Sequence, residues 1–145
     1  LSINLWSGGE LDNSISSSEM INPGYTILIS DEGSSNGYAC IKLTKNSSSG
    51  DYIRFPLSVS ENNSTILFKL DVFNPVSELY LLIGQKDGEN NIISSQNLTV
   101  PISTMFVQES LNTSISENCV SIFCQVRLPN VEDYAYIDNL QLYIS

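Results

Sequence analysis

The 145-residue chain is predicted to fold as an all-β jelly-roll sandwich of two antiparallel sheets. Short runs that alternate between apolar and polar residues recur along the whole chain and are separated by turn residues. Apolar residues rarely recur at the three-and-four spacing of a helix. Together these patterns predict about nine strands with one buried face each. The length suits one domain, residues 1–145, with a substantial core.

The first strands are expected after a polar, serine-rich stretch. They cover 25–30, 38–44 and 52–59, with turns or loops at 31–37 and 46–51. Pro56 in the third strand favours an edge position or a bulge, because proline lacks the N–H that a central strand would use.

The clearest alternation covers 65–73, where Ile66, Phe68, Leu70 and Val72 share one face. A strand at 79–83 and a hairpin turn at 86–91 follow, leading into Ile92–Ile93. Strands at 97–102 and 104–108 precede a polar connector at 110–118. The next strand is expected to place Val120, Ile122, Cys124 and Val126 in the core.

The closing run, 134–145, is expected to be one alternating strand. Ile137, Asn139, Gln141 and Tyr143 point one way, and Tyr136, Asp138, Leu140, Leu142 and Ile144 point the other. A carboxylate on such a core-directed face is costly unless something compensates it. Asp138 is therefore interpreted either as a hydrogen-bonded residue at a strand end or as a metal ligand.

Composition argues against several classes of partner. Six basic and sixteen acidic residues give a net charge of −10, which repels phosphate backbones, so nucleic acid is not expected. No apolar run approaches the length of a membrane span, so no membrane partner is expected either. Cys40, Cys119 and Cys124 lack metal-ligand spacing, the sequence contains no histidine, and buried free thiols are expected.

Several motifs resemble, in chain order, those of carbohydrate-binding modules with the galactose-binding-like jelly-roll fold. Residues 4–12, NLWSGGELD, resemble the opening of these modules, and 136–140, YIDNL, resemble their last strand. Segments 37–43 and 121–126 stand where the modules have an early and a penultimate strand. The resemblance covers nearly the whole chain. Because residue 1 opens on the motif without an export signal, the domain is expected to be excised from a longer polypeptide with linked neighbouring domains.

In the resembling modules a structural calcium ion joins the first and last strands. Carried over by motif, Asp12 and Asp138 would supply carboxylate ligands and Glu10 a backbone carbonyl. Calcium prefers such oxygen ligands. Asp12 stands where the family more often has glutamate, and the alternative is a metal-free fold in which Asp12 is exposed.

A glycan site requires aromatic faces for sugar C–H surfaces and planar polar groups for hydroxyls. The outward positions of the core strands supply Lys69, Asp71, Phe73, Tyr80, Phe123, Gln125 and Arg127 as ligand-binding candidates. The alternatives are an ordinary solvated sheet face, or a loop-edge site that includes Tyr134 and Tyr136.

The resemblance implies a non-catalytic carbohydrate-binding module that holds a secreted enzyme on a polysaccharide or oligosaccharide. The rival hypothesis is a structural or adhesive sandwich of a phage tail, a capsid decoration or a cell-surface protein, because fold does not settle function. The expected location is extracellular, or the virion surface. Catalysis is not expected, although Asp71 with Glu78 or Asp87 stays open as a carboxylate pair.

Overall fold

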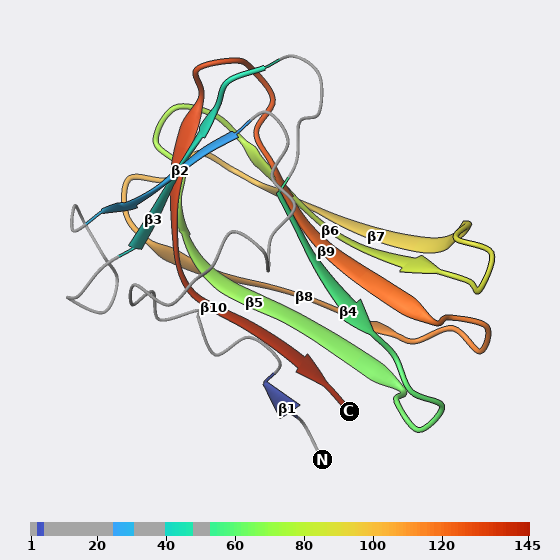
Figure 1. The fold of residues 1–145 in the computed structure, drawn as a ribbon. Helices are drawn as coiled ribbons and strands as arrows, with labels where there is room; N and C mark the ends of the chain where they lie inside the picture. The colour runs from blue at the N-terminus through green and yellow to red at the C-terminus, as the bar shows by residue number, and fades with distance from the viewer. Residues whose placement is uncertain (1–2, 5–24, 31–39, 48–52) are drawn as a thin grey trace.

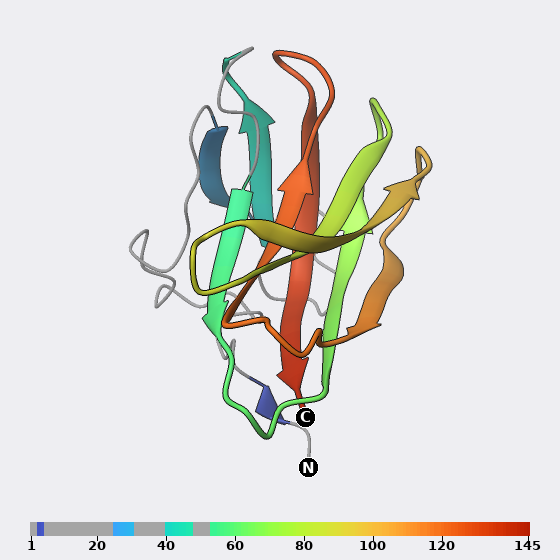
Figure 2. The ribbon, with the colours of Figure 1, turned by 90° about the vertical axis from the view of Figure 1, so that its right-hand side faces the viewer.

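The computed structural model describes residues 3–4, 25–30, 40–47 and 53–145, which form ten strands. The strands are β1 (Ile3–Asn4), β2 (Tyr25–Ser30), β3 (Cys40–Lys45), β4 (Ile53–Ser58), β5 (Thr65–Phe73), β6 (Leu79–Lys86), β7 (Ile92–Val100), β8 (Val107–Ser114), β9 (Ser121–Arg127) and β10 (Tyr134–Ile144). They form two sheets, which Figures 1 and 2 show from two sides. Over these residues no helix is long and apolar enough to cross a membrane.

Sheet A has the order β2-β3-β10-β5-β8, and β1 pairs with the last residues of β10. Sheet B has the order β4-β9-β6-β7. All of these pairings are antiparallel, which confirms the predicted two-sheet sandwich. Among the described strands, β4 lies at the edge of sheet B beside β9, which confirms the position expected for Pro56.

The core lies between the sheets and is built from the alternating positions of the central strands. The four inward residues expected at 65–73 are at most 1% exposed, and Leu79, Leu81 and Ile83 of β6 are fully buried opposite them. Each such side chain contributes roughly 1.5–3 kcal/mol relative to its exposed state. Val120 was expected in this core but is 49% exposed, because it precedes β9 and lies outside the alternation of that strand.

Two segments differ from the sequence-based expectation. β7 is one continuous strand over Ile92–Val100, and β8 occupies Val107–Ser114, largely where a polar connector was expected. Among the described strands, β8 lies at one edge of sheet A and β2 at the other, and Leu111 is the only buried residue of β8. An edge strand of this kind needs few apolar residues, so its alternation is weak in the sequence.

β10 contains a bulge that reverses its sidedness. Its register with β5 shifts between Asp138 and Gln141, and Asn139 has a φ of 49°. Before the bulge, Asp138 is the register partner of Asp71 and so shares the outer side of sheet A with it. Beyond the bulge, Gln141 takes that outer side. The expected sidedness is therefore wrong for the first half of the strand, and Asp138 is not core-directed, although it is fully buried.

Two buried polar side chains form hydrogen bonds to loops at one end of the sandwich. Asn74 is fully buried, and its Nδ2 donates toward the carbonyls of Ser77, Val100 and Pro101 at 2.9, 3.2 and 3.0 Å. At the same end of the sandwich, Lys45 is 3% exposed and its Nζ donates to the Leu128 carbonyl at 3.1 Å. These bonds order the loops that flank both sheets.

Candidate functional site

The structure separates the seven expected ligand-binding residues into two groups on opposite sides of the molecule. Lys69, Asp71 and Phe73 alternate with core residues of β5 and lie on the outer side of sheet A. Tyr80 of β6 and Phe123, Gln125 and Arg127 of β9 lie on the outer side of sheet B. The hydrophobic core lies between these two sides, so the seven residues cannot belong to one site.

The outer side of sheet B presents aligned rows of side chains, which we call the sheet B face. The face comprises the outward positions of β9, β6 and β7: Ser121, Phe123, Gln125, Arg127, Tyr80, Leu82, Gly84, Lys86, Ser95, Asn97 and Thr99. The pairing places Arg127, Tyr80 and Thr99 in one row. The next row contains Gln125, Leu82 and Asn97. Successive rows are about 7 Å apart.

Tyr80 gives this face its accessible aromatic ring. The ring is half-buried, and its hydroxyl donates to Glu78 Oε2 at 3.4 Å. Gln125 is also half-buried, whereas Arg127 and Asn97 are exposed. An aromatic ring beside two amides and a guanidinium can stack on a sugar ring and donate to its hydroxyls.

Phe123 is held flat against the sheet. Its ring lies over Gly84, where an added Cβ would approach Phe123 Cζ to 2.1 Å. Lys86 Nζ lies 5.4 Å from the ring centroid. At 6% exposure Phe123 offers little surface to a ligand, so it supports the face more than it presents a stacking platform. Its role in ligand binding stays a prediction.

Sequence reasoning missed Lys86 and Asn97 as members of this face. Lys86 was assigned to the hairpin turn because the strand was expected to end at Ile83, but β6 continues to Lys86. The period-two continuation from Tyr80 through Leu82 and Gly84 was the available signal. Asn97 could not be placed, because its register with Leu82 depends on pairing that one sequence does not specify.

The outer side of sheet A carries an aromatic cluster whose rings pack on one another. Phe73 stacks on Tyr136 with centroids 5.5 Å apart, and Phe106 lies 5.8 Å from Phe73. Tyr134 meets Tyr136 edge-on at 6.0 Å, and Lys42 Nζ lies 4.7 Å from the Tyr134 centroid. Tyr136 is 7% exposed, so much of the aromatic surface in this cluster is already covered.

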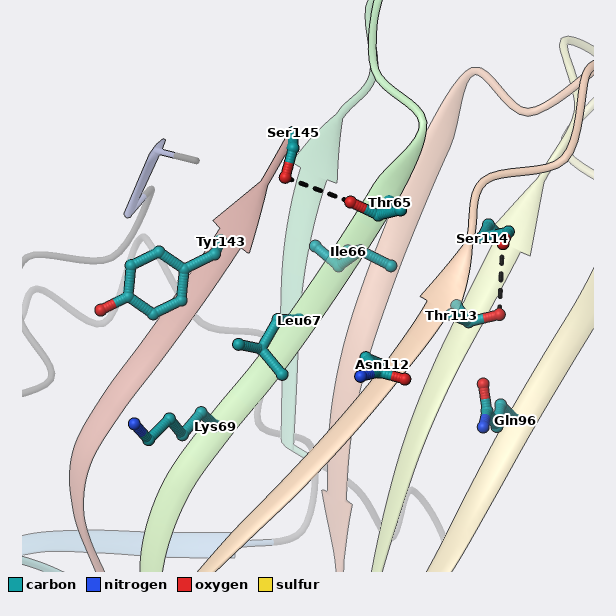
Figure 3. Close-up of a pocket in the computed structure, with 10 residues that line it drawn as sticks. All are labelled: Thr65, Ile66, Leu67, Lys69, Gln96, Asn112, Thr113, Ser114, Tyr143 and Ser145. Carbon is teal, nitrogen blue, oxygen red and sulfur yellow. Dashed lines mark hydrogen bonds between the residues drawn. The ribbon is translucent and has the colours of Figure 1, made fainter. Parts of the chain in front are cut away.

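Sheet A also carries a shallow groove of about 840 Å³. Tyr143, Leu67 and Asn112 form one row across β10, β5 and β8 on its floor, as Figure 3 shows. Lys69 lies beside this row, and Gln96 of β7 closes the far side. Among the expected ligand-binding residues, only Lys69 lines this groove. The groove offers one aromatic ring, from Tyr143, and mostly polar groups.

Of the three expected metal ligands, Glu10 and Asp12 lie outside the described residues, and only Asp138 can be placed. Asp138 is fully buried, and its Oδ1 accepts the Asn139 N–H at 2.9 Å. Asp71, its register partner, accepts the Asn139 side-chain amide at 2.7 Å. In the part of the chain that the structure describes, no group of three or more metal-binding side chains gathers.

No family model and no curated protein matches the chain. Similarity appears among solved structures. The CBM22-1 xylan-binding domain of Paenibacillus barcinonensis Xyn10C has a TM-score of 0.70 and 13% identity, covering 99% of this chain and 92% of that one. The structure described as Family 16 Carbohydrate Binding Module-2 has a TM-score of 0.67 and 16% identity, covering 96% of this chain and 99% of that chain.

A third similar structure is the enzymatically active domain of tailspike protein 4 from bacteriophage CBA120. Its TM-score is 0.76 at 13% identity, and the match covers 99% of this chain but only 22% of the tailspike chain. This chain therefore spans about a fifth of the length of that solved chain. The structural neighbours include several carbohydrate-binding modules, and this chain shares their β-sandwich fold.

Proposed function

We propose that this chain is a non-catalytic carbohydrate-binding module whose ligand lies on the sheet B face. The observation that carries the proposal is the arrangement of Tyr80, Gln125 and Arg127 on neighbouring rows of this face. The fold shared with carbohydrate-binding modules supports it. The rows cross the strands and follow one another along them, which suits a linear ligand that lies along the strands and contacts several rows at once.

The chemistry of the face matches the needs of a sugar ligand. A pyranose ring presents C–H groups that pack on an aromatic ring, which Tyr80 offers. Its hydroxyls need donors and acceptors, which the amides of Gln125 and Asn97 supply together. Polar groups exposed at the β7 edge allow a chain to continue beyond the central rows.

The positions of the acidic residues favour a face that binds a glycan without hydrolysing it. The strands of sheet B, all of them described, contain no Asp or Glu. Glu78 and Asp87 flank opposite ends of β6, about 30 Å apart along the strand, whereas glycosidase carboxylates lie about 5–10 Å apart. Asp71 lies on sheet A. None of the carboxylate pairs considered from the sequence is therefore placed for hydrolysis across this face.

The test is affinity electrophoresis of the purified chain through gels that contain xylan, β-glucan, mannan, pectin or no polysaccharide. Retardation in one gel is expected, and Tyr80→Ala should abolish most of it, because the stacking surface is lost. Tyr143→Ala is the matched control, since it removes an aromatic ring from the opposite side. Loss with Tyr143→Ala alone would move the site to the sheet A groove. A folded chain that no gel retards would refute the proposed function.

A structural calcium ion at Asp138 forms a second part of the proposal. Asp138 and Asp71 occupy directly paired positions, where two carboxylates repel each other. A divalent cation with oxygen ligands would offset that repulsion and the cost of burying Asp138. Calcium at one hundred times its dissociation constant would stabilise the fold by about 2.7 kcal/mol. Adding calcium should raise the thermal unfolding midpoint of the parent chain. It should leave the midpoint of Asp138→Asn unchanged.

The alternative function is a structural or adhesive domain of a phage tail or another surface protein. The specific observation in its favour is the TM-score of 0.76 to the tailspike domain. Under either function the domain would act outside the cell or on a virion surface, joined to further domains. A binding module would raise the local concentration of its linked partner on the polysaccharide. Retardation of the chain in a polysaccharide gel would support the binding module, and its absence would favour the structural or adhesive domain.

A further inference from the structure

The charges of this acidic chain are distributed unevenly between the two sheets. The chain has sixteen acidic and six basic residues. The four strands of sheet B, each described over its full length, contain three of the basic residues and none of the acidic ones: Arg54, Lys86 and Arg127. Among the strands that the structure describes, those of sheet B thus carry a net positive charge, in a molecule whose net charge is −10.

The strand pairing spreads these residues along the sheet B face. Arg127 is the register partner of Tyr80, and Lys86 is that of Ser121, six residues further along β6. They are therefore about 20 Å apart along the sheet. The backbone register places Arg54 opposite Gln125, one row from Arg127. Basic residues therefore occur at several rows that a linear ligand along the strands would cross.

Two of the described acids, Glu78 and Asp87, flank the face at the two ends of β6. Glu78 accepts the Tyr80 hydroxyl at 3.4 Å. Asp87, which follows Lys86, accepts the backbone N–H groups of Glu89 and Asn91, both at 2.9 Å. These bonds direct both carboxylates into local contacts at the ends of β6, and the central rows carry no negative side chain.

Among the described acids, Asp71 and Asp138 lie on the outer side of sheet A, across the core from this face. At physiological ionic strength the Debye length is about 8 Å, so charges on the far side of the sandwich are largely screened. A ligand on the sheet B face experiences mainly the nearest charges. The planar guanidinium of Arg127 can also form a bidentate pair with a carboxylate, which a neutral hydroxyl cannot match.

Building on the proposed function, we propose that the sheet B face selects an anionic glycan, namely a polysaccharide that carries uronic acid carboxylates. Tyr80 and Gln125 would contact the neutral part of the sugar. Arg127 and Lys86 would pair with carboxylates on different residues of one chain. Selectivity for charge then comes from positions separate from those that recognise the sugar ring.

The test compares polygalacturonate, alginate and glucuronoxylan with their carboxyl-reduced forms, which keep the glycan but lose the charge. Binding is measured by affinity electrophoresis and by calorimetry at low and high salt. At least one native polymer should bind about tenfold more tightly than its reduced form, and the difference should shrink at high salt. Lys86→Gln and Arg127→Gln should each weaken binding of that polymer about fivefold.

Lys69→Gln is the matched control, because it also removes one positive charge but lies on sheet A. It should leave binding unchanged. Equal binding of native and reduced polymers, or binding only to neutral β-glucan or mannan, would overturn the charge selectivity and leave the proposed function intact. An equal loss in Lys69→Gln would also overturn it, because net charge would then be the cause. No binding to any polysaccharide would overturn both proposals.

Discussion

The contact between Phe123 and Gly84 makes a sharp prediction about stability. In Gly84→Ala the new Cβ would lie 2.1–2.7 Å from three atoms of the Phe123 ring, which is closer than carbon atoms can pack. The ring must therefore turn away from β6 toward solvent. A ring that is now 6% exposed would lose part of its burial, and its contact with Lys86 would be broken.

The expected magnitude follows from two opposing effects. Overpacking costs about 1–3 kcal/mol, and the ring can relieve part of it by moving outward. Replacing glycine in a strand returns about 0.5–1 kcal/mol, because the unfolded chain has less freedom to lose. Gly84→Ala should therefore destabilise the fold by about 1–2 kcal/mol, which corresponds to roughly 3–6 °C in Tm for a domain near this size.

A double-mutant cycle in urea measures the contact itself. Phe123→Ala removes the ring, so adding Gly84→Ala to it should be neutral or slightly stabilising. The interaction energy between the two changes should be about 2 kcal/mol, with the double variant more stable than additivity predicts. The reasoning is refuted if Gly84→Ala alone does not destabilise, or if its cost is the same in the Phe123→Ala background.

Three further predictions concern buried or hydrogen-bonded polar groups. Asn74→Ala should lower the free energy of unfolding in urea by about 2–4 kcal/mol, because buried carbonyls lose their hydrogen-bond donor. A decrease of less than about 1 kcal/mol would contradict this role. Hydrogen bonds from Asn91 and Glu89 lower the pKa of Asp87 below its usual 3.8, so its stabilising effect is present above that pH and lost as pH falls further. At neutral pH the parent chain should therefore unfold at a higher urea concentration than Asp87→Ala, and this difference in midpoint should disappear in acid. A difference that does not change with pH would show that the charged carboxylate is not its cause. Burial raises the thiol pKa of Cys124, so it should resist alkylation at neutral pH until the chain unfolds, and rapid labelling of the native chain would show that the strand opens.

The fold was largely predictable because its central strands obey simple alternation. The strand expected at 65–73 has the observed bounds of β5, since one side of it meets the core along its whole length. β8 escaped detection because a single residue, Leu111, is buried along it. The reversal within β10 depends on the positive φ of Asn139. Asparagine tolerates a positive φ, but its presence in a sequence does not predict one.

The candidate site was predictable only in part. Alternation assigns Tyr80 and Gln125 correctly to the outside of their strands. It does not say which sheet each strand joins, so Lys69 and Asp71 were grouped with them although they lie on the other sheet. That assignment depends on pairings between residues far apart in the chain, such as Tyr80 with Arg127, and these require coordinates.

The place of β10 has a consequence for how the protein is made. The last strand of the sandwich lies between β3 and β5, and it joins those two strands into one sheet. During synthesis β3 and β5 would leave the ribosome with unpaired edges and could not complete sheet A until β10 followed. Strand edges left open in this way invite pairing with other chains. We therefore expect slow folding, in which sheet A closes only after β10 has been made.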